Sequence, residues 1–329
     1  MTGKLTIGLP SKGRLQENAF DFFAHAGMKV EKDGGRGYRG RLGGVGNVDI
    51  AFLSASEIAA SLESGVIHFG VTGEDLIREQ IVAPENAVEL LVPLGFGQAN
   101  VIVAVPQSWI DVRTMADLDD VALSFHSRHG RRLRVATKYL NLTRNFFASH
   151  GISDYLIVES LGATEGAPAA GSAEVIVDIT STGATLAAND LKILDDGTML
   201  KSQANLVASL KANWCADAQA AAKDMLARIG ARMLARNVTE LRFAWNGGDD
   251  ALLDRLINNL DCEIPNPPNL DETREGAEIF VQCPTARVAD AVALLHTQGK
   301  DAVSATQADY IFRARNELFE RLKHRIAGT

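Results

Sequence analysis

The stretch V-I-V-D-I-T-S-T-G-A-T-L-A-A-N at residues 175–189 decides the fold. Residues 175–177 have the β-branched composition of a short buried strand, which we expect to end at the carboxylate of Asp178. Small and hydroxyl-bearing residues surround Gly183, and a helix-forming Leu-Ala-Ala run follows. A strand, a small-residue turn and a helix N-terminus form a natural anion site, because backbone N–H groups and the helix dipole favour negative charge. An ordinary strand-to-helix connection with a Ser or Thr N-cap is the alternative, and the stretch alone does not decide between them.

Length and composition limit the class of protein. The 329 residues suffice for two or three domains, and no window reaches the ~18 consecutive apolar residues of a membrane helix. The N-terminus alternates like a half-buried strand, so we expect no signal peptide. A net charge of −8 argues against general nucleic-acid binding. Cys215, Cys262 and Cys283 are odd in number and far apart, which predicts reduced thiols in a cytoplasmic protein, with neither disulfides nor a metal site.

One segment departs from the acidic background. Residues 121–153 contain no Asp or Glu. Such a local positive field suggests a polyanionic small ligand, although a solvated basic face or a subunit contact would give the same pattern. Its cations are Arg128, Arg131, Arg132, Arg134, Lys138 and Arg144.

The first strand, residues 4–9, leads into a turn with two cations, Lys12 and Arg14. A helix is predicted over 16–27. The cations would lie at the C-terminal edge of a sheet, where open α/β sheets bind ligands, unless they serve only solubility. Strands continue to alternate with helices as far as residue 210, which predicts a mainly parallel α/β architecture.

Two further regions are less regular. Residues 33–47 are rich in Gly and Arg and form either a flexible loop or a hairpin. Beyond residue 237 the order is strand, helix, a Pro- and Asn-rich loop at 264–275, strand and helix. This order predicts a separate small α+β domain, roughly ferredoxin-like, which could serve docking or regulation.

Six segments, taken together and in this order, resemble ATP phosphoribosyltransferases, the enzymes of the first step of histidine biosynthesis. The residues beyond 237 resemble, more loosely, the third domain of the long forms, which binds histidine as a feedback inhibitor. The six segments are S-K-G-R-L at 11–15, G-V-T-G-E-D at 70–75, L-G-F-G at 94–97, R-V-A-T-K-Y at 134–139, L-G-A-T-E at 161–165 and D-I-T-S-T-G-A-T-L at 178–186.

The resemblance implies a reaction and its residues. N1 of ATP would attack C1 of phosphoribosyl pyrophosphate, and pyrophosphate would leave with its Mg²⁺, so that no protein metal site is implied. Asp178 would hold the ribose hydroxyls, and Lys12 and Arg14 would face the polyphosphates. The 5-phosphate would lie in a cradle of Thr180, Ser181, Thr182, Gly183, Ala184 and Thr185. The ATP side would be lined by Gly73, Asp75, Tyr139 and Glu165, together with Lys12 and Arg14.

The implied fold is two α/β lobes resembling a type II periplasmic binding protein, plus the small C-terminal α+β domain. Lobe I would comprise residues 1–98 and 191–212, and lobe II residues 99–190. Residues 213–236 would form a linking helix, and 237–329 a regulatory or assembly domain. The family also implies a cytoplasmic homo-oligomer, a dimer or a hexamer, with no membrane or nucleic-acid partner.

One position departs from the family pattern. Ser54 stands where the family commonly has an arginine on the phosphate side, and Arg36, Arg39 or Arg41 would have to replace it. The alternative function is a non-catalytic, two-lobed small-molecule binding protein or regulatory subunit. The expected lack of a signal peptide argues against an exported binding protein, and the intact loop after Asp178 argues against a degenerate regulatory subunit.

Overall fold

The computed structural model describes residues 3–34, 38–245, 250–265 and 277–328. The chain divides into two compact units. The first comprises Met1–Phe22, Lys29–Ala221 and Leu322–Thr329, and the second Phe23–Met28 and Ala222–Arg321. The C-terminal unit therefore begins before the predicted residue 237, and the final residues of the chain group with the first unit.

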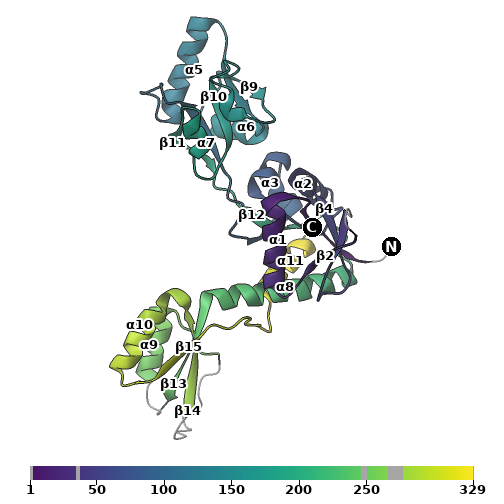
Figure 1. Ribbon diagram of the computed structural model, residues 1–329, viewed down its shortest axis with the longest axis vertical. Helices are drawn as coiled ribbons and strands as arrows, with labels where there is room; N and C mark the ends of the chain where they lie inside the picture. Colours follow the sequence, from purple (N-terminus) through teal and green to yellow (C-terminus); the bar gives the residue numbers. More distant parts are fainter. Residues whose placement is uncertain (1–2, 35–37, 246–249, 266–276, 329) are drawn as a thin grey trace. The chain divides into compact units, whose positions relative to one another are not determined.

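The first unit contains a seven-stranded sheet, as far as its residues are described (Figure 1). In its centre β1 runs parallel to both β4 and β5, so the carboxyl ends of these three strands share one edge. The outer strands are antiparallel to their neighbours. The spatial order is β2 (Val30–Lys32), β3 (Arg39–Leu42), β4 (Val48–Leu53), β1 (Leu5–Pro10), β5 (Phe69–Gly73), β12 (Ala204–Ser209) and β6 (Val88–Pro93).

Apolar helix faces cover this sheet. Ile58, Ala59 and Leu62 of α2 are buried against Ile67 and Val207 in one core cluster. α1 starts three residues before the predicted residue 16, directly after Lys12. The alternative of a hairpin for residues 33–47 is confirmed where the chain is described, because β2 and β3 pair antiparallel. The helices of this region are α1 (Gly13–His25), α2 (Ala55–Glu63), α3 (Glu74–Gln80) and α4 (Pro84–Ala87).

A second, five-stranded sheet forms the other lobe of the first unit. β10 runs parallel to β8 and β8 to β9, whereas β7 is antiparallel to β10 and β11. Residues 191–200 were predicted to return to lobe I, but they form β11 and pair with β7, so only β12 returns. The spatial order is β11 (Leu191–Leu200), β7 (Asn100–Pro106), β10 (Val175–Thr180), β8 (Leu133–Thr137) and β9 (Tyr155–Glu159).

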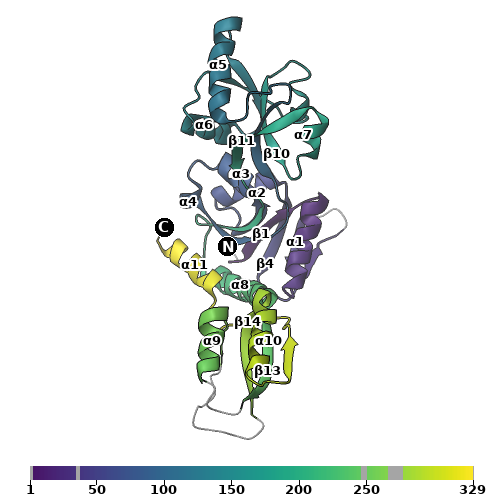
Figure 2. The same ribbon diagram turned by 90° about the vertical axis from the view of Figure 1, so that its left-hand side faces the viewer.

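The helices of this lobe bury an aliphatic and aromatic cluster that includes Leu118, Tyr139 and Phe147. α7 follows β10 and lies beside it (Figure 2). Both sheets mix parallel and antiparallel pairs, so the prediction of a mainly parallel architecture is wrong: the parallel strands are flanked by antiparallel ones. The helices are α5 (Met115–His129), α6 (Leu140–Ser149), the 3₁₀ turn η1 (Thr164–Gly166) and α7 (Ala184–Ala188).

The second unit is a small α+β domain. β13 pairs antiparallel with β14 and β15, and Glu263 forms an antiparallel bridge with Gln282 of β14. This gives the spatial order of a ferredoxin-like split βαβ fold, with both helices on one face (Figure 1). The predicted fold class, α/β lobes plus a small α+β domain, is confirmed. The elements from the linking helix onward are α8 (Ala216–Asn237), β13 (Val238–Trp245), α9 (Asp250–Leu260), β14 (Ala277–Pro284), η2 (Thr285–Arg287), α10 (Val288–Thr297), β15 (Val303–Thr306) and α11 (Glu317–Ala327).

Candidate active site

The strand at the start of residues 175–189 is longer than predicted. β10 continues to Thr180, because Asp178, Ile179 and Thr180 pair with β7. Its parallel pairing with β8 stops at Val177, opposite Thr137. Asp178 therefore does not end the strand, but it lies just beyond the parallel ladder, at the same edge as the end of β8. Its carboxylate accepts a 2.8 Å hydrogen bond from the N–H of Ile179.

The loop after β10 is organised by its own hydroxyls. The Gly183 N–H donates to Thr180 Oγ1 at 2.9 Å, and the Ala184 N–H donates to Thr182 Oγ1 at 3.4 Å. Gly183 has φ of +76°, a left-handed conformation that glycine adopts without strain. Among the described residues, the N–H groups of Ser181 and Thr182 have no acceptor, so they remain available to an anion.

The loop and a second motif line one cavity of about 240 Å³. Glu165, at the 3₁₀ turn η1, faces the same space as Asp178 and the loop. Gln98 and Ala99 also line it, and sequence analysis did not select them. The sequence feature that could have identified them is their position directly after the L-G-F-G segment. Neither side chain, however, is of a type that by itself indicates a ligand site. The cavity is lined by Gln98, Ala99, Glu165, Asp178, Ile179, Thr180, Ser181, Thr182, Ala184, Thr185 and Leu186.

Asp75 and Tyr139 meet in a buried network. The Tyr139 hydroxyl donates to Asp75 Oδ2 at 2.8 Å, and the Ser202 hydroxyl donates to Asp75 Oδ1 at 2.9 Å. Tyr139 is 1% and Asp75 5% exposed. Burial raises the pKa of Tyr139, and the carboxylates of Asp75 and Asp178 raise it further, so the phenol stays protonated. The structure thus brings together two predicted residues, Asp75 and Tyr139.

Gly73 has a steric reason to be glycine. It precedes α3 with an ordinary φ of −72°, so backbone strain does not require it. A Cβ at this position would collide with the carboxylate of Asp75. Gly73 therefore leaves room for the Asp75 side chain that Tyr139 binds.

Lys12 and Arg14 lie at the carboxyl end of β1, as predicted for the sheet edge. Both side chains are exposed. Within the described part of the chain neither makes a hydrogen bond or an ion pair, and neither lines the cavity around Asp178. Their positive charge is therefore free for a ligand, but the structure does not bring them into contact with the loop.

The Ser54 position has a local explanation. Ser54 Oγ accepts from the N–H of Glu57 at 3.2 Å, and Glu57 Oε2 accepts from the N–H of Ser54 at 2.7 Å. This reciprocal pair is a capping box with Ser54 as the N-cap, and it starts α2. Of its proposed arginine substitutes, Arg39 is exposed on β3, Arg41 pairs with Asp33 at 3.6 Å, and Arg36 lies outside the described residues.

The acid-free segment 121–153 is partly neutralised by acids outside it. Arg131 and Arg134 bind Glu174 at 3.0 and 2.6 Å, and Arg132 lies 3.4 Å from Asp154. Although burial acts in the opposite direction, the hydrogen bonds from Arg134 and Arg131 lower the pKa of Glu174 to about 2. Three of the predicted ligand cations therefore hold the lobe together instead. The other three, Arg128, Lys138 and Arg144, are exposed.

The thiols are closer than the sequence suggested. Glu263 and Gln282 exchange both backbone hydrogen bonds at 2.8 Å, which places Cys262, in the segment after α9, beside Cys283 of β14. Burial and a hydrogen bond with Cys283 raise the pKa of Cys262 to about 12. All three cysteines are free thiols. Within the described ranges no group of three or more His, Cys, Asp or Glu side chains could hold a metal ion.

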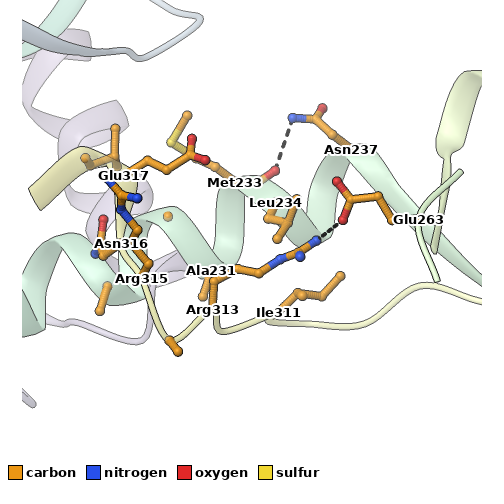
Figure 3. Close-up of a pocket in the computed structure, with 14 residues that line it drawn as sticks. Ala231, Met233, Leu234, Asn237, Glu263, Ile311, Arg313, Arg315, Asn316 and Glu317 are labelled. Carbon is orange, nitrogen blue, oxygen red and sulfur yellow. Dashed lines mark hydrogen bonds and ion pairs between the residues drawn. The ribbon is translucent and has the colours of Figure 1, made fainter. Parts of the chain in front are cut away.

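A larger cavity, of about 620 Å³, belongs to the second unit and contains none of the predicted site residues. Figure 3 shows its wall from α8, including Ala231 and Leu234, opposite the segment that carries Arg313. Arg313 binds Glu263 at one end of this cavity, and Arg315 and Glu317 lie at the other. Its charged residues have both signs, so it suits a small ligand that also carries both.

None of the described helices is long and apolar enough to cross a membrane. The family model described as ATP phosphoribosyltransferase matches residues 54–231. An ATP phosphoribosyltransferase from Rhodopseudomonas palustris (strain BisB18) is 54% identical over 324 residues, which are 98% of each chain. The enzyme of that name from Bradyrhizobium sp. (strain ORS 278) is 53% identical, also over 98% of each. A solved ATP phosphoribosyl transferase (HisG:HisZ) complex from Thermotoga maritima matches 62% of this chain and 87% of that one, at 24% identity and a TM-score of 0.47.

Proposed function

The chain belongs to the ATP phosphoribosyltransferase family, and from this membership we propose how its residues divide the work of the reaction. The enzyme joins N1 of the adenine of ATP to C1 of phosphoribosyl pyrophosphate, in histidine biosynthesis. The N1–C1 bond forms as the bond from C1 to the pyrophosphate oxygen breaks, with inversion at C1. Such a displacement needs no protein nucleophile, so catalysis comes from positioning and electrostatics.

The phosphoribosyl group is assigned to the cavity beside β10. The supporting observation is that Asp178 and the loop at 180–185 line the same space of about 240 Å³. Asp178 accepts hydrogen bonds from the ribose 2- and 3-hydroxyls, and the free N–H groups of Ser181 and Thr182 donate to the 5-phosphate. The hydroxyls of Thr180 and Thr182 keep the loop in shape and can still donate their own protons.

ATP is assigned to the side formed by Gly73, Asp75 and Tyr139, with Glu165 between the two substrates. Tyr139 and Asp75 are buried against each other, so they serve this subsite by fixing its wall. Lys12 and Arg14 offset the charge of the polyphosphates from the carboxyl end of β1. Magnesium enters with the pyrophosphate of the substrate, in keeping with its preference for phosphate oxygens and water.

Product formation tests this assignment. With ATP, phosphoribosyl pyrophosphate and Mg²⁺, the wild-type chain should make phosphoribosyl-ATP, measured by mass spectrometry, and Asp178→Ala should lose nearly all turnover. Asp120→Ala is the matched control, because Asp120 is an exposed acid of the same lobe. No product from the folded wild type would favour the non-catalytic alternative, and a near-normal Asp178→Ala rate would remove the role of Asp178.

We also propose that the second unit binds histidine as a feedback inhibitor. Support comes from the cavity of about 620 Å³, where Arg315 could take the carboxylate of an amino acid and Glu317 its ammonium group. Histidine titration of the full chain should give inhibition that Arg315→Ala weakens, whereas Arg287→Ala, at an exposed ion pair of the same unit, should not. A histidine-insensitive wild type would end this idea. The cytoplasmic location and the homo-oligomer stay predictions.

A further inference from the structure

Glu79 of α3 is a buried acid that sequence analysis did not select. Its side chain is 8% exposed and lies at the start of α6. Its carboxylate accepts hydrogen bonds from the backbone N–H groups of Asn141, at 3.0 and 3.1 Å, and Leu142, at 3.0 Å. Its backbone carbonyl accepts a further bond from Asn141 Nδ2 at 2.8 Å. These donors compensate for the burial of the carboxylate, since a buried charge without partners would cost free energy.

These donors are the N–H groups that a helix cannot satisfy internally. α6 begins at Leu140, and its N-cap residue, Tyr139, makes no side-chain capping bond. A Ser, Thr, Asp or Asn side chain normally fills this role from the adjacent position. Here an acid from the other lobe of the same unit supplies the cap, and the positive end of the helix dipole favours its charge.

The cap belongs to a pair of acids on one helix face. Asp75 and Glu79 are four residues apart on α3, so their side chains lie one above the other. Asp75 accepts a hydrogen bond from the Tyr139 hydroxyl, and Glu79 accepts hydrogen bonds from the backbone N–H groups of Asn141 and Leu142. α3 and α6 are neighbours in both views of the molecule (Figures 1 and 2). The Tyr139 side chain is therefore held at its hydroxyl by one acid, while the following backbone is held by the other.

We propose that Glu79 is a positioning residue for ATP, which it affects by fixing the start of α6 and hence Tyr139. This rests on the proposed function, in which Tyr139 forms the wall of the ATP subsite. Within the described residues, no hydrogen bond joins Glu79 to the loop at 180–185. The loss of the cap should therefore act on ATP and leave phosphoribosyl pyrophosphate unaffected.

Steady-state kinetics of Glu79→Ala and Glu79→Gln in the full chain test the proposal. Glu79→Ala should raise the KM for ATP about tenfold, the equivalent of one hydrogen bond to a charged group, with an unchanged KM for phosphoribosyl pyrophosphate. Glu79→Gln should recover part of the loss, because its amide oxygen can still accept one N–H. Arg78→Gln, which removes an exposed ion pair of the same helix, is the control and should behave as wild type.

Hydrogen exchange gives a readout that does not depend on activity. The amides of Asn141 and Leu142 should exchange faster in Glu79→Ala than in Arg78→Gln, while the core of β10 stays protected. Unchanged exchange, or equal KM increases for both substrates, would overturn the proposal. A wild type that makes no product would remove the proposed function, and the exchange rates would then still decide whether Glu79 holds α6.

Discussion

The hydroxyl of Tyr139 donates a 2.8 Å hydrogen bond to the carboxylate of Asp75, 64 residues earlier in the chain. Asp75 follows β5 of the seven-stranded sheet, and Tyr139 follows β8 of the five-stranded sheet. The bond therefore joins the ends of two strands that belong to different sheets of the first unit. Because both groups are buried, water cannot replace either partner.

Tyr139→Phe should remove this bond and leave one oxygen of Asp75 without a donor. An unsatisfied buried acceptor costs about 1–3 kcal/mol, so the urea midpoint should fall, and the KM for ATP should rise. Tyr38→Phe is the control, because Tyr38 is 78% exposed. If both variants unfold at the wild-type midpoint, the bond contributes nothing measurable to stability.

Gly183→Val should weaken the binding of phosphoribosyl pyrophosphate. No atom lies within 4 Å of a Cβ built at Gly183, so a clash inside the protein is not the reason. The reason is φ of +76°, which a β-branched residue adopts only with strain of about 1–2 kcal/mol or more. The loop should rearrange and lose affinity, measured by calorimetry, with little change in the melting temperature. Wild-type affinity would show that the loop conformation does not matter for this ligand.

Glu174 should make the stability of the second lobe depend on pH in the acid range. Its pKa is about 2 in the folded protein against an ordinary 4.5, so its contribution is complete above pH 4.5 and is lost as the pH falls toward 2. This contribution is at most about 3 kcal/mol. Glu174→Gln should lower the melting temperature at pH 7. Between pH 5 and pH 3, the melting temperature of this variant should fall by less than that of the wild type. Parallel curves for the two proteins would contradict the assignment.

The three thiols should differ in reactivity. Burial and a hydrogen bond with Cys283 raise the pKa of Cys262 to about 12, and burial also raises the pKa of Cys283, so neither forms a thiolate at pH 8. Cys215 is only partly buried. Iodoacetamide should therefore label Cys215 first, and the other two only in urea, as followed by peptide mass spectrometry. Rapid native labelling of Cys262 would show that the segment after α9 opens easily.

Much of the site could be predicted from sequence because its signals are local. Ser54 and Glu57 form their capping box within four residues, and Gly183 turns the chain with a positive φ between β10 and α7. The strand, loop and short helix of residues 175–189 also form from neighbouring residues, although β10 ends later than Asp178. That end could not be predicted, since it depends on pairing with β7, a strand more than seventy residues earlier.

By itself, the sequence supplied six motifs whose resemblance to a known family implied the fold class, the family and the site residues, since each motif is a local stretch of the chain. Only the tertiary structure decided their partners. In the folded protein Arg131 and Arg134 form ion pairs with Glu174, residues 191–200 pair with β7, and Glu79 lies at the start of α6. These contacts join residues about 40 to 100 positions apart, and they depend on strand register and burial, which no short window of sequence specifies.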